Sequence, residues 1–419
     1  MTTSATGDST AAAPASGVRL LGRLVADGSD VPDGVVVLRE GRIAYAGSSD
    51  ALPADLRAVP VPDGWRPDLV LMPGLVDIHC HGAAGGEFGG GLEEGRRAAR
   101  HHLAHGTTTL VGSIASRLPD DLVRAVGEVA ALTAEGFLAG AHLEGPFLSD
   151  ARRGAQNPAA LSDVDPELLH RAVTATREAG GSILHLTYAP ERDPAGEFPT
   201  LLAGHGIVAD IGHTDADAHA VAAALADVRR VAPRGGRPLV THLFNGMPPL
   251  HHRAPGPVAA ALAAAGRGDA VVELIGDGVH LAPETVRMVF DTVGPSSIAL
   301  VTDAMAACGM PDGRYRLSRL DVTVNDGVAR LTEGGSIAGG TATLLDVVRW
   351  TVTTAGVALA DAVTAATSTP ADALALRAGR LRPGDPGDLV VTSSDLELVL
   401  VLRGGRVVTQ APGDGRAET

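Results

Sequence analysis

The sequence predicts an α/β protein: a TIM-type (β/α)8 barrel with a small β-sandwich domain formed from both ends of the chain. Three observations favour this fold. The 419-residue chain is too long for one small core. Its middle part alternates short apolar runs with alanine-rich helical stretches, and polar side chains suited to a metal site follow most of those runs. A doubly wound open sheet is the alternative, but no glycine fingerprint opens a helix after the first strand of the middle part.

Both ends of the chain carry β-strand signals. Residues 18–70 and 383–412 hold short apolar runs cut by glycine, proline and aspartate, such as "GVVVLREGRIAYAG" and "LELVLVLRGGRVVTQ". Each of these two stretches has a glycine-containing hairpin signal. We expect them to pair into one small β-sandwich domain. Residues 1–17 are small and polar, and we expect them to form a disordered tail.

The middle part, residues 71–382, carries the barrel pattern. Its candidate strands are "GLVDIHCHG", "TTTLVGSI", "GAHLEGPF", "ILHLTYAP", "IVADIGHT", "LVTHLFNG", "VVELIGDGVH" and "IALVTDAM". Helical stretches such as "PDDLVRAVGEVAALTAEG" and "PETVRMVFDTVG" stand between them. Eight successive β/α units of this length are typical of a (β/α)8 barrel.

Composition excludes several classes of function. The net charge is −15 and no long basic run occurs, so nucleic acid and anionic membrane surfaces are not expected partners. No apolar run is long enough for a membrane span, and no basic start precedes an apolar core as in a signal peptide. Cys80 and Cys308 do not form a disulfide framework. These observations predict a soluble cytoplasmic protein.

Six of the eight candidate strands end in a side chain suited to metal binding or acid–base chemistry. These residues are His79, His81, Glu144, His213, His242, Asp277, His280 and Asp303. Each alone has a structural explanation, such as a helix cap or a buried histidine bonded to the backbone. Because the carboxyl ends of barrel strands lie on one face, the set favours a single site.

The chemistry of these groups predicts a hydrolase. Glu144, His213 and His242 can hold one divalent cation and leave a position open for water. A cation lowers the pKa of its bound water and produces hydroxide near neutral pH. Asp303 can take the proton from that water and return it to a leaving group, and His280 can polarise a carbonyl. The simplest substrate for this arrangement is an amide.

His79 and His81 extend the pattern to a second ion. Side chains alternate along a strand, so these two imidazoles face the same way, whereas Cys80 faces away from them and is expected to pack in the core. His142, two residues before Glu144, shares its face and can support the ligands. His101, His102 and His105 occupy a helical stretch and are expected at the surface.

Six motifs in this order resemble the N-acetylglucosamine-6-phosphate deacetylase family of the amidohydrolase superfamily. They are "PGLVDIHCHG", "HLEGPF", "GHTDA", "THLFNGM", "DGVH" and "LVTDAM", and the resemblance covers about residues 18–410. It implies a metal-dependent barrel that hydrolyses N-acetyl-D-glucosamine 6-phosphate to D-glucosamine 6-phosphate and acetate. It places the main metal ion at Glu144, His213 and His242, and the catalytic acid–base at Asp303.

The resemblance also implies the cofactor and the substrate contacts. One or two divalent ions are expected, zinc first and iron, manganese or cobalt as alternatives, with His79 and His81 as ligands of the second ion. The implied substrate-binding residues are Ala155, Gln156, Asn245, Gly246, Arg253, His280, Ile337, Ala338 and Gly339. Arg253 is implied to reach the substrate phosphate from the neighbouring subunit of a homodimer. Many members have histidine where this chain has Gln156, a neutral amide.

The chain has no lysine, which separates it from part of the superfamily. Dihydroorotases and hydantoinases bridge two metals with a carbamylated lysine, so a bridge in this chain falls to Glu144. Three alternatives stay open: deacetylation of N-acetylgalactosamine 6-phosphate, hydrolysis of another N-acylamine, and a catalytically inactive barrel scaffold. Intact candidate ligands and Asp303 argue against the scaffold.

Overall fold

A computed structural model describes residues 17–233 and 236–410 of the chain. The tail predicted for residues 1–17 lies outside the described residues except for Gly17. The described residues divide into two compact units, one within 75–379 and one made of 17–74 together with 380–410. No helix among the described residues is both long enough and apolar enough to cross a membrane.

The unit built from the chain ends is a seven-stranded sheet in the order β20-β19-β18-β4-β1-β2-β3. Its strands are β1 (Val18–Ala26), β2 (Ser29–Arg39), β3 (Arg42–Ser48), β4 (Val70–Pro73), β18 (Leu389–Thr392), β19 (Leu398–Arg403) and β20 (Arg406–Gln410). Strand β4 joins the two chain ends, because it pairs parallel to β1 and antiparallel to β18. Alternation along β2 sends Val36 and Leu38 into one apolar cluster and Val35 and Val37 into another. The prediction of a sheet domain from both chain ends is confirmed.

The other unit is the predicted barrel. Its sheet has the order β14-β13-β12-β11-β10-β9-β8-β5, and every neighbouring pair is parallel. The strands are β5 (Leu75–Cys80), β8 (Thr107–Ala115), β9 (Gly140–Glu144), β10 (Ile183–Tyr188), β11 (Val208–Ile211), β12 (Leu239–Val240), β13 (Val271–Leu274) and β14 (Ile298–Leu300). Past β14, a bridge from Ala304 to Cys80 brings the last strand back to the first.

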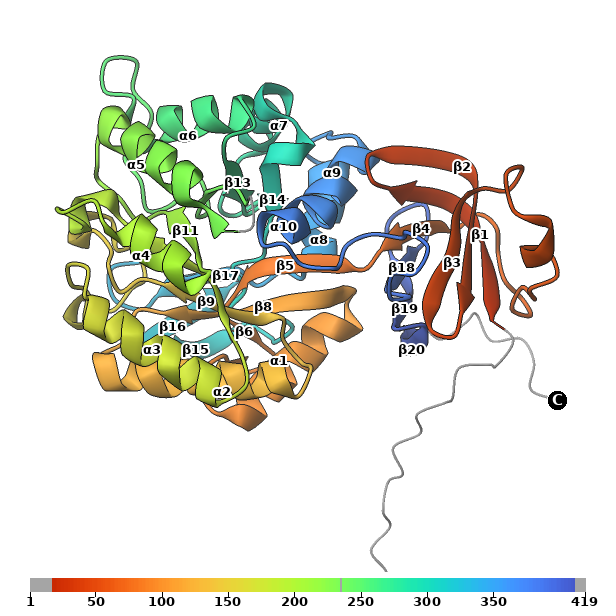
Figure 1. The fold of residues 1–419 in the computed structure, drawn as a ribbon, viewed down its shortest axis with the longest axis horizontal. Coiled ribbons are helices and arrows are strands. Elements are labelled where there is room, and N and C mark those ends of the chain that lie inside the picture. The colour runs from red at the N-terminus through yellow and green to blue at the C-terminus, as the bar shows by residue number, and fades with distance from the viewer. Residues whose placement is uncertain (1–16, 234–235, 411–419) are drawn as a thin grey trace, which may run out of the picture. The chain divides into compact units, whose positions relative to one another are not determined.

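Helices surround this sheet in Figure 1. They are α1 (Leu92–Ala104), α2 (Pro119–Ala134), α3 (Pro166–Glu178), α4 (Phe198–His205), α5 (Ala218–Val231), α6 (Gly256–Gly266), α7 (Pro283–Val293), α8 (Leu344–Thr353), α9 (Leu359–Ala365) and α10 (Ser368–Ala373). Several begin at side-chain caps: Asp165 accepts from the first turn of α3, Asp217 from that of α5, and Thr343 forms a capping box with Asp346 on α8. The (β/α)8 prediction is confirmed.

Polar side chains, not aliphatic ones, fill part of the barrel interior. On β5, Val76 and Ile78 belong to an apolar cluster that includes Ala371 of α10. Asp77 and His79 therefore face the opposite side of the strand, and both are fully buried. His142, His185, Asp210 and Glu273 from other strands are also fully buried. Buried charged groups need partners, so this interior depends on internal pairing.

Two small antiparallel sheets that the sequence did not predict are inserted in the barrel unit. One is the hairpin of β6 (Gly82–Ala83) and β7 (Gly86–Glu87), directly after His81. The other, after β14, comprises β15 (Gly313–Leu317), β16 (Leu320–Asn325) and β17 (Val328–Leu331). Its inner face packs on the segment that follows Asp303, through Met305, Ala306 and Ala307. The segment after β17 thereby reaches the carboxyl end of the barrel.

The packing of α2 against the barrel gives a stability prediction. A methyl group added at Gly181 would meet the Cα of Ala130 on α2 at 2.6 Å, and backbone atoms cannot yield. We expect Gly181→Ala to lower the free energy of unfolding by about 1–3 kcal/mol, the usual effect of overpacking. Gly127 on the same helix has no heavy atom within 4 Å of its added methyl. Gly127→Ala should therefore be neutral or stabilising by up to about 1 kcal/mol.

Chemical denaturation of both variants beside the parent chain measures the two effects. Equal unfolding midpoints for Gly181→Ala and the parent would contradict the close approach of α2 to residue 181.

Candidate active site

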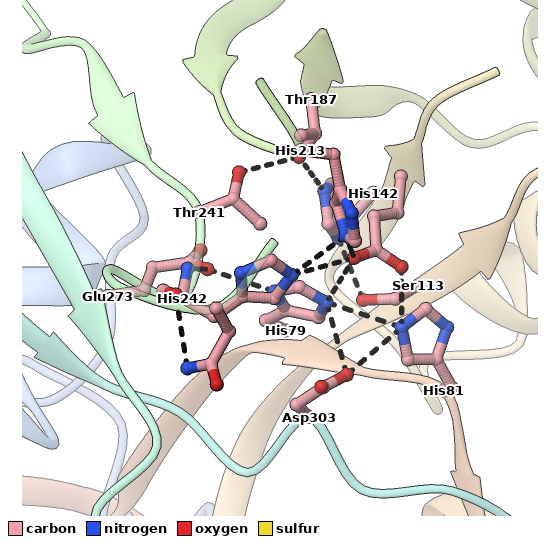
Figure 2. Close-up of polar contacts among 12 residues, drawn as sticks. His79, His81, Ser113, His142, Thr187, His213, Thr241, His242, Glu273 and Asp303 are labelled. Carbon is pink, nitrogen blue, oxygen red and sulfur yellow. Dashed lines mark hydrogen bonds and ion pairs between the residues drawn. The ribbon is translucent and has the colours of Figure 1, made fainter. Parts of the chain in front are cut away.

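The strand-end residues meet at the carboxyl end of the barrel, as Figure 2 shows. Glu144 is the last residue of β9, while His213 and His242 each follow their strand, β11 or β12, by two residues. Three of these side chains start from strained backbone, with φ of 47° at His213, 27° at His242 and 45° at Asp303. Non-glycine residues rarely adopt such angles, and strain of this kind is concentrated at functional sites.

Glu144, His213 and His242 form the first cluster of donors. The Oε1 atom of Glu144 lies 2.8 Å from Nε2 of His213 and 3.0 Å from Nε2 of His242. The Nδ1 atom of His213 lies 2.8 Å from the carbonyl oxygen of Arg152, and it can only donate there. This bond places a proton on Nδ1 of His213, so its Nε2 is the ring nitrogen that faces Glu144 and is available to a cation.

His79 and His81 form the second cluster with the same glutamate. Their Nε2 atoms are 3.2 Å apart, and Nε2 of His81 is 3.2 Å from Oε2 of Glu144. Asp303 closes this cluster, because its Oδ1 lies 3.4 Å from Nε2 of His79 and 3.2 Å from Nε2 of His81. Oε2 of Glu144 therefore faces His81, while Oε1 faces His213 and His242 and lies 3.9 Å from Nε2 of His79.

These donors fit a divalent cation. The Nε2 atoms of His213 and His242 lie 3.0 Å apart, although two imidazole lone pairs repel unless a proton or a cation is shared between them. Each histidine pair forms a cluster with Glu144 in which the three ligand atoms lie within 4.8 Å of one another. Imidazole and carboxylate are the ligands that zinc and similar ions prefer. The site therefore has the composition of a divalent-metal site.

The charges in the site support one another. Burial opposes ionisation of Glu144, but hydrogen bonds from three surrounding imidazoles hold the pKa of this carboxyl well below its usual range. Burial also opposes a charge on His79, yet Glu273 and Asp303 raise the pKa of its ring to about 10. The pKa of Asp303 is lowered, because His79 and His81 outweigh its burial. Asp303 is thus a carboxylate at neutral pH and able to accept a proton.

Asp277 and His280 form a separate pair beside this centre. The carboxylate of Asp277 accepts two backbone N–H groups, from Val279 and His280, and its Oδ2 lies 2.8 Å from Nδ1 of His280. Burial would lower the pKa of His280, but the hydrogen bond to Asp277 raises it above its ordinary value. His280 therefore more readily carries a proton on both ring nitrogens.

A cavity of about 330 Å³ opens over these groups. It is lined by His81, Glu144, Gly154, Ala155, Gln156, His213, His242, Asn245, Gly246, His280, Asp303, Leu317, Ser336, Ile337 and Gly339. Most of the implied substrate-binding residues are thus brought together. Two are not: Ala338 is fully buried in the apolar cluster under β15–β17, and Arg253 is exposed in the turn between His251 and Ala254.

Gln156 lies at the cavity wall with its amide already engaged. Its Oε1 accepts the backbone N–H of Ser116 at 2.7 Å, which orients Nε2 toward Oε2 of Glu144 at 2.5 Å. The side chain is only 5% exposed. A contact with substrate stays a prediction, and in this structure Gln156 holds the shared glutamate.

The structure also brings in residues that the sequence did not single out. Asp77 accepts from Thr302 beneath Asp303, Glu273 binds His79, and Asp210 binds His185. A charged residue inside an otherwise apolar strand is the sequence signal that could have identified all three carboxylates. The surface prediction for His102 is wrong: this side chain is fully buried and lies 3.1 Å from Sγ of Cys80. His142 lies against His79, with ring centroids 4.6 Å apart.

Comparisons with known proteins place the chain in a family. The amidohydrolase family profile matches residues 70–408. N-acetylglucosamine-6-phosphate deacetylase of Bacillus subtilis is 33% identical over 92% of this chain and 95% of its own length. N-acetylgalactosamine-6-phosphate deacetylase of Escherichia coli O157:H7 is 29% identical over 84% of this chain and 90% of its own length. A solved structure of N-acetyl-D-glucosamine-6-phosphate deacetylase from Mycobacterium smegmatis, a mutant in complex with N-acetyl-D-glucosamine-6-phosphate, is 37% identical to this chain. The two structures match with a TM-score of 0.86 over 94% of this chain and 100% of the other chain. The chain belongs to the amidohydrolase family.

Proposed function

We propose that this protein hydrolyses the acetamide of N-acetyl-D-glucosamine 6-phosphate to D-glucosamine 6-phosphate and acetate. The observation that carries the proposal is the cavity in which Glu144 is shared by two histidine pairs, with Asp303 and His280 in the same wall. Several relatives over most of the chain are named for this reaction. A cytoplasmic location agrees with this substrate and is part of the proposal.

Glu144, His213 and His242 would hold one divalent ion, and His79 and His81 would hold a second that shares Glu144. Zinc is the ion we propose first, because the donors are imidazole and carboxylate. Such an ion lowers the pKa of bound water and polarises a carbonyl oxygen that it contacts. The protein groups around the ions must then move protons and orient the acetamide.

Asp303 is the proposed acid–base. Its carboxylate is ionised and its Oδ1 faces both His79 and His81, so it could accept the proton of an attacking water. The same atom can afterwards give the proton to the departing amine. An amine leaves poorly as an anion, so this transfer is needed for the C–N bond to break.

His280 is the proposed partner of the acetyl oxygen. Asp277 accepts from Nδ1, so Nε2 is the nitrogen left for substrate. Because the pKa of His280 is raised, Nε2 more readily keeps its proton and can donate to the oxygen as negative charge develops there. Asp277 acts through His280 and need not contact the substrate.

The phosphate needs a guanidinium or ammonium partner, and the described lining of the cavity contains neither. Among its described lining residues none is an arginine, and the chain has no lysine. Arg253 is exposed, so it is available to a neighbouring molecule. We propose a homodimer in which Arg253 of each subunit binds the phosphate at the other subunit's cavity, where guanidinium geometry suits phosphate.

Metal content and acetate release test the proposal together. We expect freshly purified protein to contain zinc or a similar ion and to release acetate from N-acetyl-D-glucosamine 6-phosphate. Chelation should abolish turnover, and added zinc should restore it. Faster turnover of the galactosamine epimer, whose deacetylase is also a relative, would move the substrate assignment to that sugar. Protein without metal and without activity after zinc addition would favour the inactive scaffold.

Asp303→Asn tests the acid–base role. The amide keeps the shape of the side chain but cannot accept the proton, so we expect kcat to fall about 10²–10⁴-fold while KM changes little. Steady-state kinetics of acetate release measures both constants. Turnover at the parent rate would remove Asp303 from the mechanism.

Arg253→Ala tests the shared site. We expect KM for the phosphorylated sugar to rise about 10- to 100-fold through loss of a charge-assisted contact, with little effect on an unphosphorylated N-acetylamino sugar. Subunits carrying Arg253→Ala and subunits carrying Asp303→Asn should regain activity when refolded together, because each mixed dimer then has one intact site. No recovery in dimers shown to be mixed would argue that Arg253 acts within its own subunit.

A further inference from the structure

Two carboxylate–histidine pairs are buried side by side inside the barrel. Glu273 on β13 binds Nδ1 of His79 at 2.9 Å, and Asp210 on β11 binds Nδ1 of His185 at 2.5 Å. All four side chains are fully buried. The pairs are alike in chemistry and environment but differ in what the second ring nitrogen does.

In the pair of Asp210 and His185, the second ring nitrogen is bound to the backbone. This Nε2 lies 2.9 Å from the carbonyl oxygen of Ile78, so both ring nitrogens have partners and neither faces the site of Glu144. In the pair of Glu273 and His79, the second ring nitrogen faces the candidate active site. This Nε2 faces His81 at 3.2 Å, Asp303 at 3.4 Å and Glu144 at 3.9 Å, all members of the site described above.

The geometry around Glu273 decides which nitrogen of His79 carries the proton. Its Oε2 also accepts the backbone N–H of His242 at 3.1 Å, so this oxygen is an acceptor and Nδ1 of His79 must be the donor. Nε2 of His79 is then the ring nitrogen that faces the site, and it would give up its proton to bind a cation there. Figure 2 shows Glu273 on the opposite side of His79 from His81.

Glu273 thus contacts one member of each histidine pair. It holds the ring of His79 and the backbone of His242, whose φ of 27° needs such support. We infer that Glu273 is a positioning residue for the ion held by His79 and His81: it fixes Nε2 of His79 as a ligand and ties the ring of His79 to the backbone of His242. This inference rests on the metal ligands of the proposed function.

Zinc affinity, measured without substrate, tests the inference. Metal-free parent protein, Glu273→Gln and Asp210→Asn are titrated with Zn²⁺ against a competing chelator, and bound zinc per subunit is counted. Both substitutions remove one buried carboxylate and keep its volume, so Asp210→Asn controls for loss of a charge. We expect the parent to bind two ions, Glu273→Gln to bind the weaker ion about 10-fold less tightly, and Asp210→Asn to match the parent.

Glu273→Ala sharpens the result, because it removes the hydrogen bonds as well as the charge. We expect about 100-fold weaker binding of the same ion, with the glutamine variant intermediate between it and the parent. If the alanine variant does not fold, Glu273→Gln and Asp210→Asn still decide the outcome.

Three results would overturn the inference: parent-like affinities for both ions in Glu273→Gln, an equal loss in Asp210→Asn, or one bound zinc in the parent under excess Zn²⁺. Failure of the proposed reaction is a separate result. It would appear as absent acetate release by the zinc-loaded parent, while the pattern of zinc affinities could still hold.

Discussion

The carboxylate of Glu144 is the interaction on which the rest of the site depends. It is the only described residue that belongs to both histidine clusters, with Oε1 next to His213 and His242 and Oε2 next to His81. Buried among imidazoles, it stays ionised although burial alone would protonate it. Gln156 donates a hydrogen bond to this carboxylate and fixes its orientation, and the backbone N–H of Ser116 in turn fixes Gln156. A small rotation of this one side chain would alter both clusters at once.

The barrel accommodates this carboxylate through an unusually polar interior. Asp77, Asp210 and Glu273 are fully buried, and each accepts a hydrogen bond from a histidine, a threonine or a backbone N–H. A buried ion pair contributes little to the free energy of unfolding. Removing one partner, however, leaves an uncompensated buried charge and lowers that free energy by about 3–5 kcal/mol. The polar interior therefore serves to fix one arrangement of side chains more than to stabilise the fold. It fixes ring orientations under the mouth of the barrel, where rotation of an imidazole by a few degrees would misdirect its ligand nitrogen.

The repeating part of this architecture could be predicted from the sequence, since parallel strands and their covering helices follow local periodicity. The strand-end residues were also predictable, because barrel geometry gathers carboxyl ends whatever the details. The separate sheet of β15–β17 was missed. Its short alternating runs resemble the other strands of the chain, and a local pattern does not say which sheet a strand joins. His102 was misassigned because three nearby histidines on one helix cannot all share its exposed face, and only packing decides which one is buried.

Glu273 marks the limit of sequence reasoning more sharply. Its charge within the apolar run "VVELIG" is visible, but its partner His79 lies 194 positions earlier in the chain. Nothing local distinguishes it from Asp210, which also interrupts an apolar strand and also binds a histidine. The two differ in where the second nitrogen of that histidine points, since one meets a backbone carbonyl and the other faces the site, and only Glu273 also accepts the backbone N–H of His242. The functional distinction is thus a property of three-dimensional register, set when the barrel closes and only β14 separates β5 from β13.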